Sequence, residues 1–164
     1  MSHTVVKDND ARLIEQCTQG RRVRNVVCVP VIVAKDRAAI DTDSHILATV
    51  IDGETSATVP MFTAPCAAEV VRCYVNAKTY PSTSGASTVT FSKANIGATD
   101  TDLNTAISID NPTAETAIDG VLSTTSGALN LVEGQLVYAT VALSATTSAR
   151  SDSLVLCVEW IPKD

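Results

Sequence analysis

Short apolar runs recur roughly every ten residues along this chain of 164 residues, and turn-forming residues separate them. In three of the runs, at residues 70–75, 88–93 and 135–143, apolar and polar side chains alternate, a pattern typical of a β-strand with one buried face. The other runs that we expect to be strands lie at 26–33, 45–51, 59–61, 107–109, 117–122 and 153–160. Because no long helical pattern separates these runs, the sequence predicts an all-β, jelly-roll-like antiparallel β-sandwich of eight or nine strands.

The composition excludes several classes of protein. Hydrophobic residues make up 45% of the chain but aromatic residues only 4%, and Val, Ala, Thr and Ser predominate, a mixture that favours thinly packed sheets. No run of about 18 apolar residues is present, so we expect no membrane helix and no membrane partner. The polar, mixed-charge start at residues 1–10 does not fit a secretory signal peptide. We therefore expect a soluble domain made in a cytoplasm.

Charge is distributed unevenly along the chain. Residues 1–37 carry seven basic and four acidic side chains, a balance of +3, whereas the remainder carries five basic and fourteen acidic, a balance of −9. We expect an N-terminal arm over residues 1–25 and a single domain over residues 26–164. The acidic domain would repel a polyanion, which excludes general nucleic-acid binding.

The arm contains the candidate binding residues. It includes a predicted short helix, capped by Asp10 and ended by Gly20, whose apolar side needs a neighbour to pack against. Basic residues follow directly, and such a segment is either a solvated leader or an arm that binds an acidic protein surface. The candidate binding residues are Arg12, Leu13, Ile14, Arg21, Arg22 and Arg24.

Two predicted strands are apolar on both faces and need more cover than a sandwich core provides. Residues 26–33 are nearly all Val and Ile, and residues 153–160 are apolar on both sides except at Glu159. Pro30 cannot donate a ladder hydrogen bond, so the first of these is an edge strand or lies along a partner. We expect an oligomer interface to cover the second faces, and we expect Trp160 to fill the core.

The five cysteines form neither a CxxC pair nor a cluster with histidine, so no zinc site is expected. Cys28, Cys73 and Cys157 each lie in an apolar run, where a thiol usually acts as a small core side chain. Since a cytoplasmic protein keeps its thiols reduced, we expect all five to be free. A bridge between Cys66 and Cys73 is the main alternative.

No arrangement in the sequence fits an active site, so we predict a non-enzyme without cofactor or small-molecule substrate. His45 follows Asp43 and Ser44 directly, but neighbouring strand residues point to opposite faces and cannot form a triad. The segment from Asp100 to Asn104 begins like a calcium loop but lacks the glycine and the glutamate that later positions require. We expect its polar side chains to bond their own backbone.

The body of the chain also shows a recognisable order of short motifs. They are Phe62 to Val71, a strand ending in Asn76 and Ala77, Thr88 to Phe91, Lys93 to Asp100, Gly134 to Tyr138 and Val155 to Trp160. Over residues 58–162 this order resembles the jelly-roll proteins of tailed-bacteriophage virions, especially capsid decoration (cement) proteins and head-fibre domains.

The resemblance implies a structural protein that is made in the host bacterial cytoplasm and located on the outer capsid surface of the virion. Proteins of this kind form homotrimers between subunits of the major capsid protein, and an extended N-terminal arm often reaches neighbouring capsomers. Residues 1–25 would then be the capsid-binding arm, and fully extended they span roughly 80 Å.

Two other functions remain open at this point. A carbohydrate- or host-surface-binding jelly-roll module of a phage fibre would need aromatic side chains on a concave sheet, and the chain offers few. An enzyme subunit would need a site on the acidic loops, where Asp100 and Asp102 are the candidates. Fold analogy alone does not choose between these functions.

Overall fold

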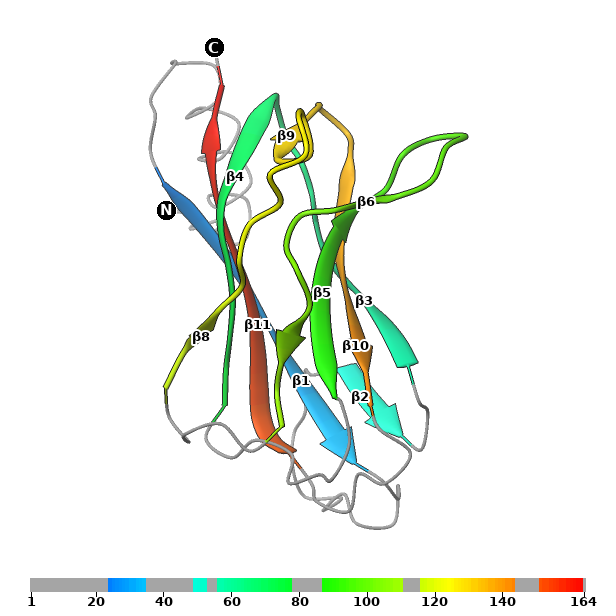
Figure 1. Ribbon diagram of the computed structural model, residues 1–164, viewed down its shortest axis with the longest axis vertical. Coiled ribbons are helices and arrows are strands. Elements are labelled where there is room, and N and C mark those ends of the chain that lie inside the picture. The colour runs from blue at the N-terminus through cyan, green and yellow to red at the C-terminus, as the bar shows by residue number, and fades with distance from the viewer. Residues whose placement is uncertain are drawn as a thin grey trace, which may run out of the picture.

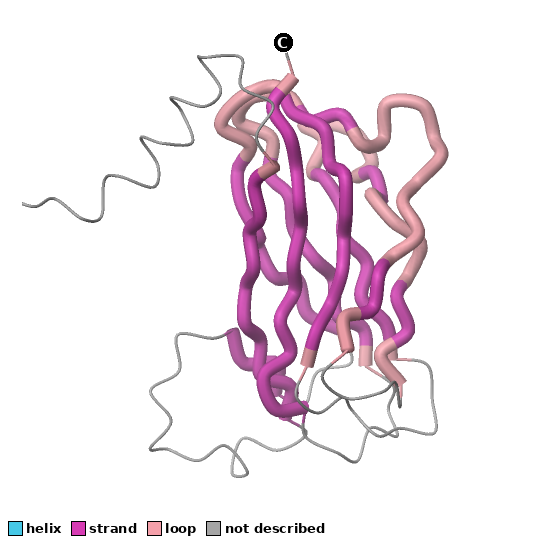
Figure 2. Tube along the Cα trace, turned by 90° about the vertical axis from the view of Figure 1, so that its left-hand side faces the viewer, coloured by secondary structure: helices cyan, strands magenta, loops and turns pink. Residues whose placement is uncertain are grey.

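The computed structural model describes residues 24–34, 49–52, 56–77, 87–110, 116–143 and 151–163. These ranges contain no helix and form two sheets that pack face to face, which confirms the predicted antiparallel β-sandwich. Figure 1 shows the strands running along the long axis of the molecule, and Figure 2 shows the same strands after a 90° turn about that axis. The predicted helix between Asp10 and Gly20 and the strand start at His45 lie outside the described residues.

Sheet A contains the first and last strands of the described part. Its members are β1 (Asn25–Ala34), β2 (Thr49–Asp52), β4 (Ala68–Asn76), β8 (Ile118–Asp119), β9 (Asn130–Leu131) and β11 (Ser151–Pro162). Their order is β2-β1-β11-β4-β8, with β9 also paired to β4, and all pairs are antiparallel except β1 with β2. Strand β2 pairs only with Val31–Ala34, so Pro30 lies where β1 is paired with β11 alone among the described strands.

Sheet B packs against sheet A and is antiparallel throughout. It consists of β3 (Ser56–Thr63), β5 (Thr88–Lys93), β6 (Thr101–Asp102), β7 (Ile107–Ser108) and β10 (Leu136–Ala142). The order is β3-β10-β5-β6, with β7 also paired to β5. The described part therefore has more strands than the eight or nine predicted, because β6 and β9 are two-residue pairings in segments where no strand was predicted, whereas β7 and β8 lie within the predicted runs 107–109 and 117–122.

The core lies between the sheets and follows the predicted alternation. Val89 and Phe91 on β5 are fully buried, as are Val137, Ala139 and Val141 on β10. Trp160 fills one part of this core, as predicted, and stacks against the ring of Phe62 with ring centroids 5.9 Å apart.

One predicted inward residue on β4 is wrong. The alternation over residues 70–75 predicts that Val71, Cys73 and Val75 share one face. Cys73 and Val75 are buried together as expected, but Val70 is buried in place of Val71. The cause is a β-bulge in β4 itself: Glu159 pairs with Arg72 and the next residue, Trp160, pairs with Val70, so Val71 is the extra residue and the alternation shifts by one there.

Candidate interaction surfaces

Only one candidate residue of the predicted arm belongs to the described part. Arg12, Leu13, Ile14, Arg21 and Arg22 lie outside the described residues. Arg24 directly precedes β1, its side chain is 64% exposed, and its guanidinium forms an ion pair with Glu159 Oε2 at 3.1 Å. The arm's last basic residue is thus attached to the final strand of the domain.

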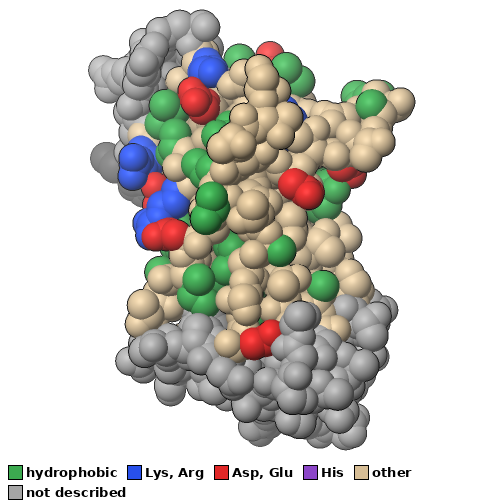
Figure 3. Space-filling model, viewed as in Figure 1, with side chains coloured by type: hydrophobic (Ala, Val, Ile, Leu, Met, Phe, Trp, Pro, Cys, Tyr) green, Lys and Arg blue, Asp and Glu red, His purple; other side chains and the backbone are tan. Residues whose placement is uncertain are grey.

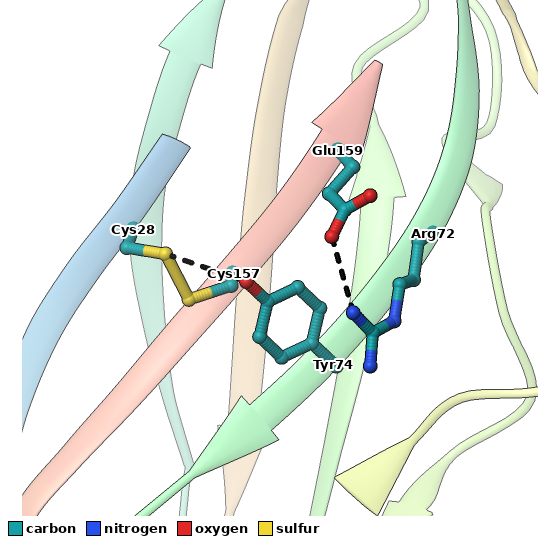
Figure 4. Close-up of a disulfide and its surroundings, with 5 residues drawn as sticks. All are labelled: Cys28, Arg72, Tyr74, Cys157 and Glu159. Carbon is teal, nitrogen blue, oxygen red and sulfur yellow. Dashed lines mark hydrogen bonds and ion pairs between the residues drawn. A yellow bond between two sulfur atoms is a disulfide. The ribbon is translucent and has the colours of Figure 1, made fainter. Parts of the chain in front are cut away.

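Glu159 is the centre of a charged cluster on the outer face of sheet A. Its side chain is only 7% exposed, and its second oxygen, Oε1, accepts a hydrogen bond from Arg72 Nη1 at 3.2 Å. Arg72 also donates from Nε to Asp119 Oδ1 on β8 at 2.6 Å. Its guanidinium lies 4.2 Å from the centre of the Tyr74 ring, a cation–π contact visible in Figure 4.

The cluster fixes the charge state of Arg72. The hydrogen bond to Asp119 raises the pKa of Arg72 above its ordinary value, and burial acts in the opposite direction but is outweighed by the two carboxylates together. The guanidinium therefore stays charged, and it links β4 to β8 on one side and to β11 on the other. Figure 3 shows basic and acidic side chains gathered together at the left-hand edge of the molecule.

A disulfide between Cys28 and Cys157 crosses the same face, which overturns the prediction that all cysteines are reduced. The two residues are directly opposite each other in the antiparallel β1–β11 pair, with Cα atoms 4.2 Å apart. Their side chains share the outer face, where Tyr74 Oη lies 4.0 Å from Cys28 Sγ (Figure 4). The apolar runs predicted strands but could not reveal that these two thiols are neighbours.

The alternative bridge from Cys66 to Cys73 is also wrong. Cys73 is free and fully buried on the inner face of β4, as expected for a core thiol. Burial raises its pKa to about 12, so the thiol stays protonated and unreactive. Cys66 is itself disulfide-bonded, but not to Cys73.

A loop over residues 94–100 projects from the end of β5, on the right in Figure 1. Its conformation is fixed by Asn95, whose Nδ2 donates to Thr99 O at 2.8 Å and to Thr101 Oγ1 at 2.9 Å. The backbone N–H of Asn95 donates to Asp100 Oδ1 at 3.0 Å, which is the local bonding that we predicted for this segment. Gly97 supplies the turn with a φ of 72°, a value that favours glycine.

The loop is also attached to the neighbouring turn. Gln135 Nε2 donates to Ala94 O at 2.9 Å and to Asn95 Oδ1 at 3.0 Å, and its Oε1 accepts from the N–H of Val132. Ile96 at the loop tip is fully exposed, and Val132 and Leu136 on the adjoining segment are 63% and 38% exposed. Three of the five large exposed apolar side chains in the described part therefore belong to this end of the molecule.

Carboxylates flank the loop. Tyr138 donates from its hydroxyl to Asp100 Oδ2 at 2.6 Å, and Ser92 donates to Asp102 Oδ1 at 2.7 Å. The bond from Tyr138 lowers the pKa of Asp100, whereas burial and this carboxylate raise the pKa of Tyr138. Within the described ranges no group of three potential ligands could hold a metal ion.

Lys93 is a buried charge that periodicity did not identify as structural. Its Nζ donates to the carbonyls of Gly127 at 2.8 Å and Asn130 at 2.6 Å, so it holds the turn before β9. Burial lowers its pKa. The available signal was its position two residues after Phe91 on an alternating strand, which places it on the inner face.

The outer face of sheet B is polar. Thr58, Thr140 and Thr90 lie opposite one another across β3, β10 and β5 and form a threonine row. Ser92 and Tyr138 continue the same face toward the projecting loop. This matches the expectation that one face of these strands is left to water.

Comparisons with family models, curated proteins and solved structures return no significant match for the chain. The part of the chain that the structure describes contains no helix that could span a membrane.

Proposed function

We propose that this protein is a structural virion protein that decorates and stabilises an icosahedral phage head, as a homotrimer bound between major capsid subunits. The observation that carries the proposal is the fastening of β1, the strand that follows the arm. A disulfide joins Cys28 to Cys157, and an ion pair joins Arg24 to Glu159. A segment that clips neighbouring capsomers transmits tension to the strand behind it, and here that strand is covalently fixed to the body.

The charge distribution supports the same function. A basic arm can bind an acidic protein surface, and three arms in one trimer engage together at high effective concentration. A small contribution from each arm thereby gives strong attachment to the head. The proposal requires neither a catalytic group nor a cofactor.

Co-sedimentation with undecorated heads of the phage that encodes this chain tests the proposal. The wild-type protein should pellet with the heads, and a variant lacking residues 1–23, which keeps Arg24 and all of β1, should stay in the supernatant.

The triple change of Arg21, Arg22 and Arg24 to alanine should weaken binding most at low salt, because salt screens exposed charges. Arg24→Ala alone separates the loss of the Glu159 ion pair from the loss of arm charge. Binding of the truncated form at wild-type strength would remove the arm from the proposal.

A second candidate function, recognition of a glycan on a host surface, is favoured by one feature of sheet B. The threonine row leads to Tyr138, whose hydroxyl donates to Asp100 at the edge of a polar face. A glycan array separates the two functions: a saturable signal that Tyr138→Ala removes would support glycan binding.

A further inference from the structure

We infer that the 94–100 loop of one protomer docks through Ile96 onto the outer face of β1 in a second copy of this chain. The inference rests on the proposed function, since it assigns the contact that would build the trimer. It is carried by three observations: the loop is held rigid, its apolar tip is followed by two exposed carboxylates at the loop base, and an apolar surface with an exposed guanidinium lies on the other side of the molecule.

The rigidity of the loop makes it suitable as an anchor. All three hydrogen-bonding groups of the Asn95 amide, two N–H and one oxygen, are occupied, and Gln135 ties the loop base to the next turn. The tip therefore presents Ile96 in one arrangement before binding, and little conformational entropy is lost when it docks.

The tip combines an apolar anchor with acidic flanks. Ile96 is fully exposed and no charged residue lies among residues 94–99. Asp100 and Asp102 follow immediately, and both are exposed carboxylates. A complementary surface would offer apolar contact for the tip and exposed guanidinium groups beside it.

The outer face of β1 has this character. Val26, Cys28 and Pro30 alternate along it and are exposed, with Val26 at 51%. Exposed Arg24 stands at one end of this row, and its carboxylate partner Glu159 is buried, so the guanidinium dominates the charge at the surface. On the outer face of sheet B, by contrast, the corresponding rows are threonine and serine.

The two surfaces point in opposite directions within one molecule. The loop leaves sheet B and projects to the right in Figure 1, whereas the outer face of sheet A, which includes β1, is the side turned to the viewer in Figure 2. A contact between them is therefore heterologous, head to tail, and it closes into a ring when the rotation between copies allows. A ring of three is the closure that the proposed function requires.

Native mass in solution tests the contact with the chain alone. Light scattering on a sizing column should give the wild type three times 17.2 kDa. Ile96→Asp and Val26→Asp should each raise the concentration at which half the chains associate by about thirtyfold or more, as expected for loss of an interface anchor. Val121→Asp, at an exposed apolar position on neither surface, is the matched control and should leave the mass unchanged.

A mixing experiment distinguishes a head-to-tail contact from any symmetric one. Ile96→Asp chains keep an intact β1 face, and Val26→Asp chains keep an intact loop. In an equimolar mixture, the loop of a Val26→Asp chain can therefore dock onto the β1 face of an Ile96→Asp chain, which gives a dimer with one contact. Sedimentation should show each variant alone at 17.2 kDa and the mixture at twice that mass. A wild type that remains a monomer, an Ile96→Asp trimer, or a mixture that does not associate would overturn the loop contact. Co-sedimentation with heads is measured separately, so decoration can stand when this contact fails.

Discussion

The two outer faces of the sandwich are built in different ways. On sheet A, side chains connect one strand to the next: the Cys28–Cys157 disulfide joins β1 to β11, and Arg72 joins β4 to β8 and β11. On sheet B, the threonine row lies across three strands with short side chains only. Cross-strand pairs of the second kind contribute about 0.2–1 kcal/mol each, whereas a disulfide contributes about 2–4 kcal/mol. The same architecture thus has one face fastened by a disulfide and ion pairs, and one face whose side-chain links between elements are the hydrogen bonds of Ser92 and Tyr138.

Removing the disulfide is the strongest test of the difference between the outer faces of sheets A and B. We expect the double variant Cys28→Ser, Cys157→Ser to lose about 4 kcal/mol of unfolding free energy, because the bridge closes a loop of 129 residues in the unfolded chain. Urea unfolding without reductant measures the loss, since reductant would also open the disulfide at Cys66. An unchanged midpoint would show that the bridge does not fasten this face.

The charged cluster is the next largest contribution on sheet A. Arg72→Leu should cost about 1–2 kcal/mol, because the buried carboxylate of Glu159 keeps only its ion pair with Arg24. Asp119→Ala is the matched control: it removes an exposed partner of the same guanidinium and should cost less than about 0.5 kcal/mol. Equal losses in the two variants would mean that the burial of Glu159 does not determine how much the cluster contributes to the unfolding free energy.

On sheet B, the link between Tyr138 and Asp100 should appear as a pH effect. The pKa of Asp100 lies below its ordinary value of 3.8, so its contribution to stability is complete above pH 3.8 and is lost as pH falls through the lowered value. Tyr138→Phe should move this pKa toward 3.8 but not fully, since the N–H of Asn95 still donates. Carboxyl NMR titration would measure both values, and an unchanged pKa in the variant would contradict the hydroxyl's role.

The smallest effect is expected on the threonine row. Thr140→Val should change unfolding free energy by no more than about 0.5 kcal/mol, because the row contributes little beyond its backbone pairs. Ala139→Val, one residue away on the fully buried inner face, should cost about 1–3 kcal/mol through overpacking. A large loss at Thr140 would erase the difference between the two faces.

The alternation of apolar and polar residues predicted the strands whose side chains are buried at every second position. The alternation of β5 and β10 gave their strand bounds closely and identified Val89, Phe91 and Val137 as buried. It failed at Val71, because Val71 is the extra residue of a bulge in β4, which is defined only by the pairing of β4 with β11 from a distant part of the chain. The pattern of residues within one strand does not show how that strand is aligned with a distant partner strand.

The interaction surfaces were less predictable for the same reason. The pairing of Cys28 with Cys157 depends on the register between two strands whose cysteines are 129 residues apart, and our expectation of a cytoplasmic origin argued against it. Lys93 is explained only by the carbonyls of a turn more than thirty residues later. Of the arm residues chosen from charge and spacing, Arg24 alone lies in the described part, where it bonds to the far end of the chain.

The disulfide between Cys28 and Cys157 also has a consequence for how the protein would survive proteolysis. It closes most of the chain into a covalent ring, since almost every loop of the domain lies between these two residues. A single protease cut at any loop inside the ring opens it without releasing a fragment. The nicked protein would therefore remain one covalently joined molecule, and the cut would become visible only when the disulfide is reduced.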